Sequence, residues 1–261
     1  MTTSHPTNDA VARARGRLIV ALDVGGEPAA LRLVERLAGE VGIFKIGLEL
    51  FTLAGPGIVA RVRAAGGGAG IFLDLKFHDI PNTVERAVRA ATSLGVEMLT
   101  LHASGGGEML RAAVRGSAGG EAPAAGRPLL LGVTVLTSSN AGTLRELGLE
   151  APTENAVATQ VVRLARLAQG AGLGGLVASP LEIDPLRAAV GPSLRLVIPG
   201  VRPIWAAEAG DQRRVLTPSE AVAAGADFLV VGRPITGATD PVEAARRVVE
   251  EIVQGAGAGG R

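Results

Sequence analysis

Residues 71–83 read IFLDLKFHDIPNT, and this stretch sets a pattern that the rest of the chain repeats. It opens with an apolar run typical of a buried strand, and a helical pattern starts at Thr83. Because side chains alternate along a strand, we expect Asp74 and Lys76 on one face at its end, with Asp79 in the following loop. Charges rarely occupy a strand end unless they are paired or needed. The stretch therefore predicts either a structural ion pair or a functional site.

The composition excludes several classes of protein. The chain has 261 residues, of which 47% are hydrophobic, enough to form a core. Its formal net charge is +1, so it lacks the excess of basic residues that is typical of nucleic-acid-binding proteins. It contains no cysteine, so disulfides, thiolate metal sites and cysteine nucleophiles are excluded. The polar N-terminus does not resemble a signal peptide, and no apolar run approaches the ~20 residues of a membrane span. We therefore expect a cytoplasmic protein that binds neither nucleic acid nor membrane.

Strand-like apolar runs alternate with helical patterns eight times along the chain. Such near-continuous Val, Ile and Leu runs are typical of a parallel sheet that is buried on both faces. The strands are expected at residues 18–22, 43–47, from 71, 98–102, 129–135, 175–178, 194–198 and 228–231. Eight units in a chain of this length predict an α/β fold, a single-domain (β/α)8 TIM barrel. We expect this catalytic barrel domain to span residues 17–254, between flexible tails at residues 1–16 and 255–261.

Functional residues of such a barrel lie at the carboxyl ends of the strands and in the loops that follow them. Polar side chains are expected there after five consecutive strands: Asp23, Lys45, Asp74, Lys76, His102 and Thr137. This convergence favours a site over an isolated ion pair. For His102 we expect a neutral, supporting role, and for His78 no role in proton transfer.

The last two strands carry features that suit a phosphate group. Barrel enzymes often bind phosphate with the loops after strands seven and eight. After the eighth strand, Gly232 allows backbone N–H groups close to an anion, and Arg233 supplies a fork of donors. Arg202 and Gln212 are expected opposite them, in the loop after the seventh strand. The sequence therefore predicts a phosphate site at this end of the barrel.

The motif D-x-K-x-x-D at residues 74–79, followed by I-P-N-T, resembles the signature of the orotidine 5′-phosphate decarboxylase family. Segments PGVRP, GDQRR and VVGRPIT resemble the phosphate loop and strand-eight motif of that family, so the resemblance covers residues 18–253. It implies cofactor-independent decarboxylation of orotidine 5′-monophosphate to uridine 5′-monophosphate and CO2, the last step of de novo pyrimidine biosynthesis. It also implies a homodimer and no metal.

The resemblance further implies the roles of individual residues. Lys76 is the implied proton donor, held by Asp74 and by Asp79 of the neighbouring subunit, with Lys45 in the same catalytic array. The residues implied to bind substrate are Asp23 and Lys45 for ribose, Arg202, Gln212, Gly232 and Arg233 for phosphate, Thr137 for the base, and Ile80 and Thr83 for the neighbouring subunit's ribose. Gln212 is also implied to reach the pyrimidine. One departure is the stretch 203–211, which is a residue longer than the family's pattern and more apolar at Ile204 and Trp205.

Two alternatives remain from the residues themselves. The first is a Mg²⁺-dependent sugar-phosphate decarboxylase or aldolase of the same superfamily, in which D-x-K-x-x-D also occurs. Such an enzyme needs a carboxylate on the second strand, where this chain has Lys45. The second is a non-catalytic barrel that binds a phosphate ligand, and it has no need of Lys76 between two carboxylates.

Overall fold

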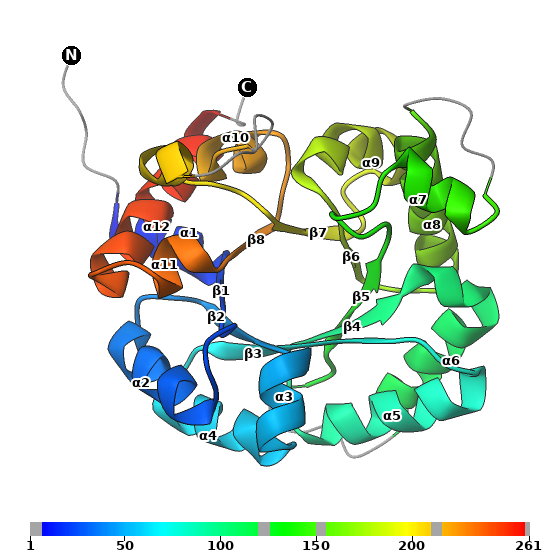
Figure 1. Cartoon of the computed structure of the whole chain (residues 1–261), viewed down its shortest axis with the longest axis horizontal. Helices are drawn as coiled ribbons and strands as arrows, with labels where there is room; N and C mark the ends of the chain where they lie inside the picture. The colour runs from blue at the N-terminus through cyan, green and yellow to red at the C-terminus, as the bar shows by residue number, and fades with distance from the viewer. Residues whose placement is uncertain (1–6, 120–125, 150–154, 210–215, 259–261) are drawn as a thin grey trace. The chain divides into compact units, whose positions relative to one another are not determined.

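The fold is built on eight strands that form a closed barrel in sequence order, β1 to β8. A computed structural model describes residues 7–119, 126–149, 155–209 and 216–258. The strands are β1 Leu18–Ala21, β2 Ile43–Gly47, β3 Gly70–Phe77, β4 Met98–His102, β5 Leu129–Val133, β6 Gly175–Val177, β7 Arg195–Pro199 and β8 Phe228–Val231. Helices follow the strands along the chain, which confirms the (β/α)8 barrel predicted from the sequence (Figure 1).

The helices carry the chain from one strand to the next. They are α1 Asn8–Gly16, α2 Glu27–Leu37, α3 Leu48–Ala54, α4 Gly57–Ala65, α5 Pro81–Ser93, α6 Gly106–Ala118, α7 Ala141–Glu146, α8 Ala156–Gly170, α9 Ile183–Val190, α10 Pro218–Ala223, α11 Arg233–Thr236 and α12 Pro241–Ala258. Short 3-10 turns also occur: η1 Ala103–Gly105, η2 Pro180–Glu182 and η3 Ile204–Ala209. None of the helices in the described ranges is both long and apolar enough to cross a membrane.

Two short helices that the hydrophobic pattern does not predict depend on local capping. At α7, the side chain of Asn140 accepts a hydrogen bond from the Thr143 N–H, and the Thr143 hydroxyl accepts from the Asn140 N–H. At α10, Thr217 and Glu220 form the same reciprocal arrangement. Six-residue helices are too short to show a periodic apolar stripe, so capping residues are the signal that identifies them.

The segment 8–16 is a helix in the structure, whereas the sequence predicts a flexible tail there. Thr7 caps α1 by accepting from the Ala10 N–H at 3.3 Å, and Ala14 is buried. The end of α1 also packs closely on the chain before β2, because a Cβ at Gly42 would meet the backbone of Gly16 at 2.7 Å. Capping and close packing therefore order this segment despite its polar composition.

The tail predicted from residue 255 is likewise ordered at its start, because α12 continues to Ala258. A Cβ at Gly255 would meet the carbonyl oxygen of Ser219 at 2.3 Å, so only glycine lets α12 approach α10 this closely. Residues 1–6 and 259–261 of the two expected tails lie outside the described ranges.

Strand ends also differ from the prediction in places that matter for the site. Strand β5 ends at Val133, two residues before the predicted end, and a turn follows in which the Ser139 N–H donates to the Leu136 carbonyl. Strand β3 extends to Phe77 and therefore includes both charged residues of the motif.

The chain divides into two compact units. The first consists of residues 1–72 and 200–261 and contains β1, β2 and β8. The second consists of residues 73–199 and contains most of β3 together with β4 to β7. Each unit carries its own group of polar residues.

Candidate active site

In the first unit, the ends of β1 and β2 bring Asp23 and Lys45 together. The two strands are parallel, Ala21 is level with Lys45, and the Leu22 N–H donates to the Lys45 carbonyl at 3.0 Å. This register places the Lys45 Nζ 3.1 Å from Asp23 Oδ1. Only 10% of the Lys45 side chain is exposed, against 62% for Asp23. The ammonium is therefore buried at the strand end, and the carboxylate faces solvent where a ligand could reach it.

Gly47 is a supporting residue that the sequence pattern does not single out. A Cβ at this position would lie 3.1 Å from both Asp23 Oδ1 and Lys45 Nζ. This distance is tighter than ordinary van der Waals contact, so any larger residue pushes against the pair. The glycine therefore leaves room for the ion pair to form.

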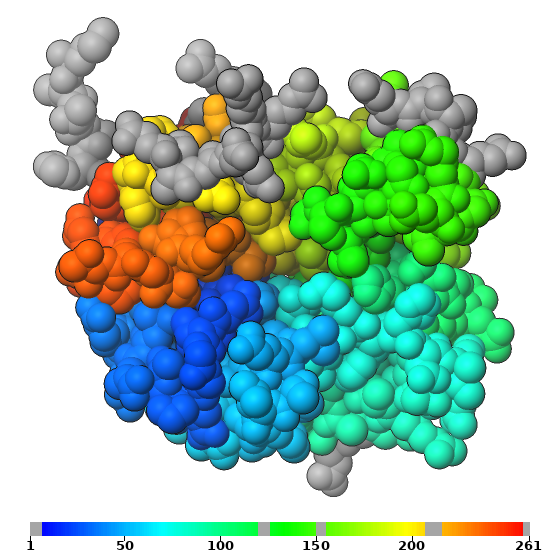
Figure 2. Space-filling model, viewed as in Figure 1, coloured from blue at the N-terminus to red at the C-terminus, as the bar shows by residue number. Residues whose placement is uncertain are grey.

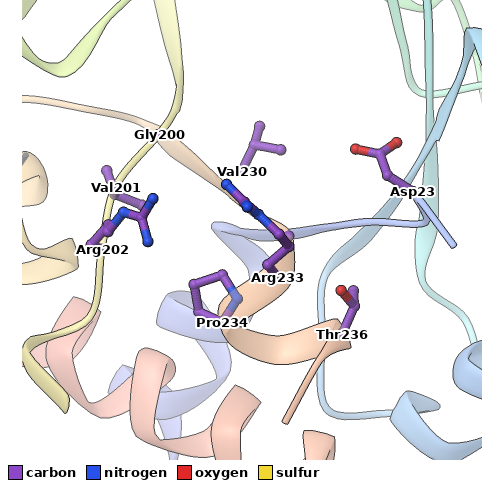
Figure 3. Close-up of a pocket in the computed structure, with 9 residues that line it drawn as sticks. Asp23, Gly200, Val201, Arg202, Val230, Arg233, Pro234 and Thr236 are labelled. Atoms are coloured by element: carbon purple, nitrogen blue, oxygen red, sulfur yellow. The ribbon is translucent and has the colours of Figure 1, made fainter. Parts of the chain in front are cut away.

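A pocket of about 360 Å³ opens beside this pair, between the chain after β7 and the chain after β8. Figure 3 shows Arg202 and Arg233 with their guanidinium groups at the pocket and Asp23 across from them. In Figure 2, the surface of α11 (orange) lies against the chain that follows β1 (dark blue). The pocket is within the size range of small-ligand sites and places two cations where an anionic group would enter.

Gly232 lies between β8 and α11 and lines the same pocket. Among the described residues, a Cβ there would meet only Ala21 Cβ, at an ordinary 3.8 Å, so packing within this part of the chain does not require a glycine. The lack of a side chain instead leaves the backbone open toward the pocket. Gln212, the other residue expected at the phosphate, lies outside the described residues.

The unusual apolar pair after β7 has a structural explanation. Trp205 packs against α12, where the Arg247 guanidinium lies 4.6 Å from the centre of its ring. Glu251, also on α12, is buried next to this contact, and burial is the main cause that raises its pKa. Ile204 remains 66% exposed. Trp205 therefore anchors the start of this loop to the C-terminal helix.

In the second unit, Asp74 and Lys76 form an ion pair at the end of β3. The Lys76 Nζ donates to Asp74 Oδ1 at 3.0 Å and to Oδ2 at 2.9 Å. The side chains are 13% exposed for Asp74 and 29% for Lys76. The two charged side chains expected together at the end of this strand therefore meet as an ion pair. The ammonium is thus held by two short bonds while part of it remains accessible.

Thr100 on β4 joins this pair and was not anticipated from the sequence. It is fully buried, its hydroxyl donates to Asp74 Oδ1 at 2.9 Å, and it accepts from the Lys76 backbone N–H at 2.9 Å. The sequence offers one signal for it: Thr100 is a polar residue in an otherwise apolar strand, and it lies two residues before His102, so both are expected on the same face.

His102 ends β4 and lies near the same charges. Burial is the largest cause that lowers its pKa, followed by His78 and Lys76, while Asp74 opposes them. The ring of His78 lies 5.5 Å from that of His102. A lowered pKa favours the neutral imidazole at pH 7, in keeping with the supporting role expected for His102.

The remaining predicted residues are all exposed. Asp79 lies beyond β3, and its Oδ1 accepts from the N–H of Ile80 at 2.7 Å. Ile80 is 65% exposed, and Thr83 lies in the first turn of α5. Thr137 lies in the turn four residues after β5 rather than at the strand end. The structure therefore pairs Lys76 with Asp74 inside this unit and leaves Asp79 facing outward.

The two groups offer different chemistry. The pair Asp74–Lys76 presents a fixed ammonium that can stabilise a developing negative charge and donate a proton. The pair Asp23–Lys45 offers hydrogen-bond partners for hydroxyl groups, and the arginine-lined pocket suits a phosphate. Among the described residues, no three His, Cys, Asp or Glu side chains gather as metal ligands.

Comparison with known proteins gives a consistent result over nearly the whole chain. The family model described as "Orotidine 5′-phosphate decarboxylase / HUMPS family" matches residues 16–248. A curated orotidine 5′-phosphate decarboxylase of Syntrophotalea carbinolica is 52% identical over 244 residues, covering 92% of this chain and 96% of that protein. The protein of the same name from Anaeromyxobacter sp. (strain K) is 54% identical over 233 residues, covering 89% of this chain and 96% of that protein.

A solved structure is similar as well. The crystal structure of orotidine 5′-phosphate decarboxylase from Lactobacillus acidophilus superposes with a TM-score of 0.77 at 37% identity. The match covers 90% of this chain and 98% of that one.

Proposed function

Because the chain belongs to the orotidine 5′-phosphate decarboxylase / HUMPS family, we propose that it converts orotidine 5′-monophosphate to uridine 5′-monophosphate and CO2. The observation that carries this proposal is the Asp74–Lys76 pair, in which two bonds of 2.9 and 3.0 Å hold an ammonium at the end of β3. This reaction is the last step of de novo pyrimidine nucleotide synthesis, and the enzyme is a carboxy-lyase.

The reaction breaks the bond between C6 and the carboxylate carbon, and the bonding electrons stay on C6. The resulting carbanion has no adjacent carbonyl to accept the charge, so the protein must stabilise it electrostatically. In this proposal the Lys76 ammonium lies beside C6, stabilises the negative charge as CO2 leaves, and then donates its proton to C6. Asp74 holds the ammonium in place through the two hydrogen bonds. The neutral amine regains its proton from solvent.

The other predicted residues bind the rest of the nucleotide. Asp23 accepts hydrogen bonds from the ribose hydroxyls and Lys45 donates to them, and the positive charge of Lys45 also contributes to catalysis. The phosphate occupies the pocket lined by Arg202, Gly232 and Arg233. Binding energy from this remote group supports the orientation of C6 against Lys76. Thr137 lies by the base, and Gln212 completes the phosphate site and reaches the pyrimidine.

We further propose that the active form is a cytoplasmic homodimer with shared sites. Asp79 and Ile80 are exposed beyond β3, a position from which their side chains can leave their own subunit. In the dimer Asp79 completes the charged array around the neighbouring subunit's Lys76. Ile80 and Thr83 reach the neighbouring ribose. The nucleotide is the only partner needed besides the second subunit.

The first alternative is a Mg²⁺-dependent sugar-phosphate decarboxylase or aldolase of the same superfamily. The buried ammonium of Lys45 opposes a divalent cation at the end of β2, because its charge has the same sign. A non-catalytic phosphate-binding barrel is disfavoured by the Asp74–Lys76 pair, which a binding protein does not need.

The test is loss of ultraviolet absorbance from orotidine 5′-monophosphate in buffer treated with chelator. We expect turnover without added metal, and none by a Lys76→Ala variant. Activity that appears only with Mg²⁺ and a sugar phosphate supports the alternative and contradicts the proposal.

A further inference from the structure

Thr100 connects the two charged partners of β3 through a single hydroxyl group. A threonine hydroxyl has one hydrogen to donate and lone pairs that accept. Here the hydrogen goes to Asp74 Oδ1 at 2.9 Å, and a lone pair accepts the Lys76 backbone N–H at 2.9 Å. Thr100 is 0% exposed, so water cannot take over either bond. One buried group therefore fixes both the carboxylate and the backbone of the lysine.

The backbone of Lys76 needs such support. Its φ of +51° lies in the left-handed region, and it is the one non-glycine residue with a positive φ in the described part of the chain. Such a conformation persists only when the surroundings determine it, and it is found most often at functional sites. The hydroxyl of Thr100 is bonded to the N–H of this residue, so it acts directly on the strained position.

We propose that Thr100 is a positioning residue for decarboxylation, which holds the Lys76 ammonium in its reactive place by fixing the left-handed backbone and the Asp74 carboxylate together. The inference rests on the proposed function. The hydrogen bond from the Lys76 N–H to Thr100 fixes the direction in which the Lys76 side chain leaves the strand. The hydrogen bond from Thr100 to Asp74 fixes the position of the carboxylate that binds the Lys76 ammonium. Without the hydroxyl, the ammonium loses both constraints.

The hydroxyl, rather than the bulk of the side chain, carries this role. Valine has nearly the shape of threonine but can neither donate nor accept, so Thr100→Val removes the acceptor of the Lys76 N–H and one of the hydrogen bonds to Asp74 Oδ1. Serine retains the hydroxyl and loses only the methyl group. Thr100→Ser should therefore preserve the reaction where Thr100→Val does not.

The effect should fall on turnover more than on nucleotide binding. Decarboxylation depends on the ammonium being correctly placed against C6, and small displacements are costly. Uridine 5′-monophosphate has no carboxylate at C6 and binds through its ribose and phosphate. We expect Thr100→Val to lower kcat by about 10- to 100-fold, as for loss of hydrogen bonds to charged groups. The Kd of the product nucleotide should change by no more than about threefold, and Thr100→Ser should stay within about threefold of wild type in kcat.

The experiment measures kcat, product Kd and thermal unfolding for wild type, Thr100→Val, Thr100→Ser and Thr92→Val. Thr92 is a matched control, because it is also buried but its hydroxyl donates only to the Val88 carbonyl within α5. Thr92→Val should keep the wild-type kcat. A crystal structure of Thr100→Val should show a changed Lys76 φ or a longer Lys76–Asp74 distance.

A wild-type kcat in folded Thr100→Val, or equal losses in Thr100→Val and Thr92→Val, would overturn the proposal. If Thr100→Val does not fold, Thr100→Ala and Thr100→Ser are compared at equal folded fraction, and equal kcat values contradict it. A wild-type enzyme without decarboxylase activity rejects the proposed function instead. In that case the crystal structure decides, and unchanged Lys76 geometry in the variant overturns the positioning role.

Discussion

Glu182 is a buried carboxyl group whose removal should stabilise the protein at neutral pH. It lies in η2, after β6, where its Oε2 accepts a hydrogen bond from the Ser179 N–H at 2.8 Å. The residue is 7% exposed, and this burial raises the pKa of the carboxyl to about 7 from an ordinary value of 4.5. The folded protein therefore binds this proton more tightly than the unfolded chain does. The perturbation is Glu182→Gln, which keeps the shape and the acceptor but cannot ionise.

The size of the effect follows from the two pKa values. Because the pKa is raised on folding, the protonated Glu182 contributes to the free energy of unfolding. This contribution is fully present below pH 4.5 and is lost as the pH rises through about 7. A difference of about 2.5 units between the folded and unfolded pKa values corresponds to about 3 kcal/mol of stability, at about 1.36 kcal/mol per unit. Relaxation of the loop and entry of water reduce this amount, so we expect Glu182→Gln to be more stable than wild type by about 1 to 3 kcal/mol at pH 8. Near pH 4.5 the two proteins should be nearly equal.

The assay is urea unfolding at several pH values from about 3.5 to 8, with the free energy of unfolding as the readout. Glu220→Gln is the matched control, because Glu220 holds the same position in the capping box of Thr217. There, hydrogen bonds from the Thr217 backbone and side chain lower the pKa of the carboxyl. Glu220→Gln should therefore be less stable than wild type at pH 8, and the gap should close as the pH falls below 4.5. If the free energy of unfolding depends on pH equally in wild type and Glu182→Gln, the pKa of Glu182 is not raised by folding and the prediction is wrong.

Other predictions concern the site. Arg233→Ala should weaken binding of uridine 5′-monophosphate by roughly 1.5–3 kcal/mol, measured by calorimetry, because a charge-assisted phosphate contact is lost. Added phosphite should then rescue a substrate without phosphate in wild type far better than in this variant. Lys76→Ala should bind the product nearly normally while decarboxylation is lost; if binding is lost instead, the two ends of the site are exchanged. Mixing inactive Lys76→Ala with inactive Asp79→Ala subunits should restore activity in heterodimers, and no recovery after verified subunit exchange contradicts a shared site. Gly47→Ala should lower kcat/KM, because its Cβ would press on Lys45 Nζ, and wild-type kinetics would show that the pair tolerates the methyl group.

The sequence predicts the barrel well because its signals are local and strong. Strands β2, β4 and β8 lie where the apolar patterns place them. The sequence does not predict helix α1, the end of α12, or the short helices α7 and α10. These elements depend on capping residues and on single glycines such as Gly42 and Gly255, which produce no periodic pattern of apolar residues. Such features become visible only when the packing partner is known.

Within the site, spacing predicts which charges meet but not how they are held. The two-residue separation of Asp74 and Lys76 predicts a shared face, and the structure pairs them. The left-handed backbone of Lys76 contradicts what alternation along a regular strand implies, and its support comes from Thr100, 24 residues away in the sequence. A contact between neighbouring strands at one particular register cannot be deduced from either strand alone.

The most direct test of the central claim is release of labelled CO2 from carboxyl-labelled orotidine 5′-monophosphate by chelator-treated enzyme. The measurement compares wild type with Lys76→Ala, after binding of uridine 5′-monophosphate has shown that both proteins are folded and occupied. We expect rapid release by wild type without any added metal and no release above background by the variant. Undiminished release by Lys76→Ala, or release by wild type only after Mg²⁺ is restored, would contradict it.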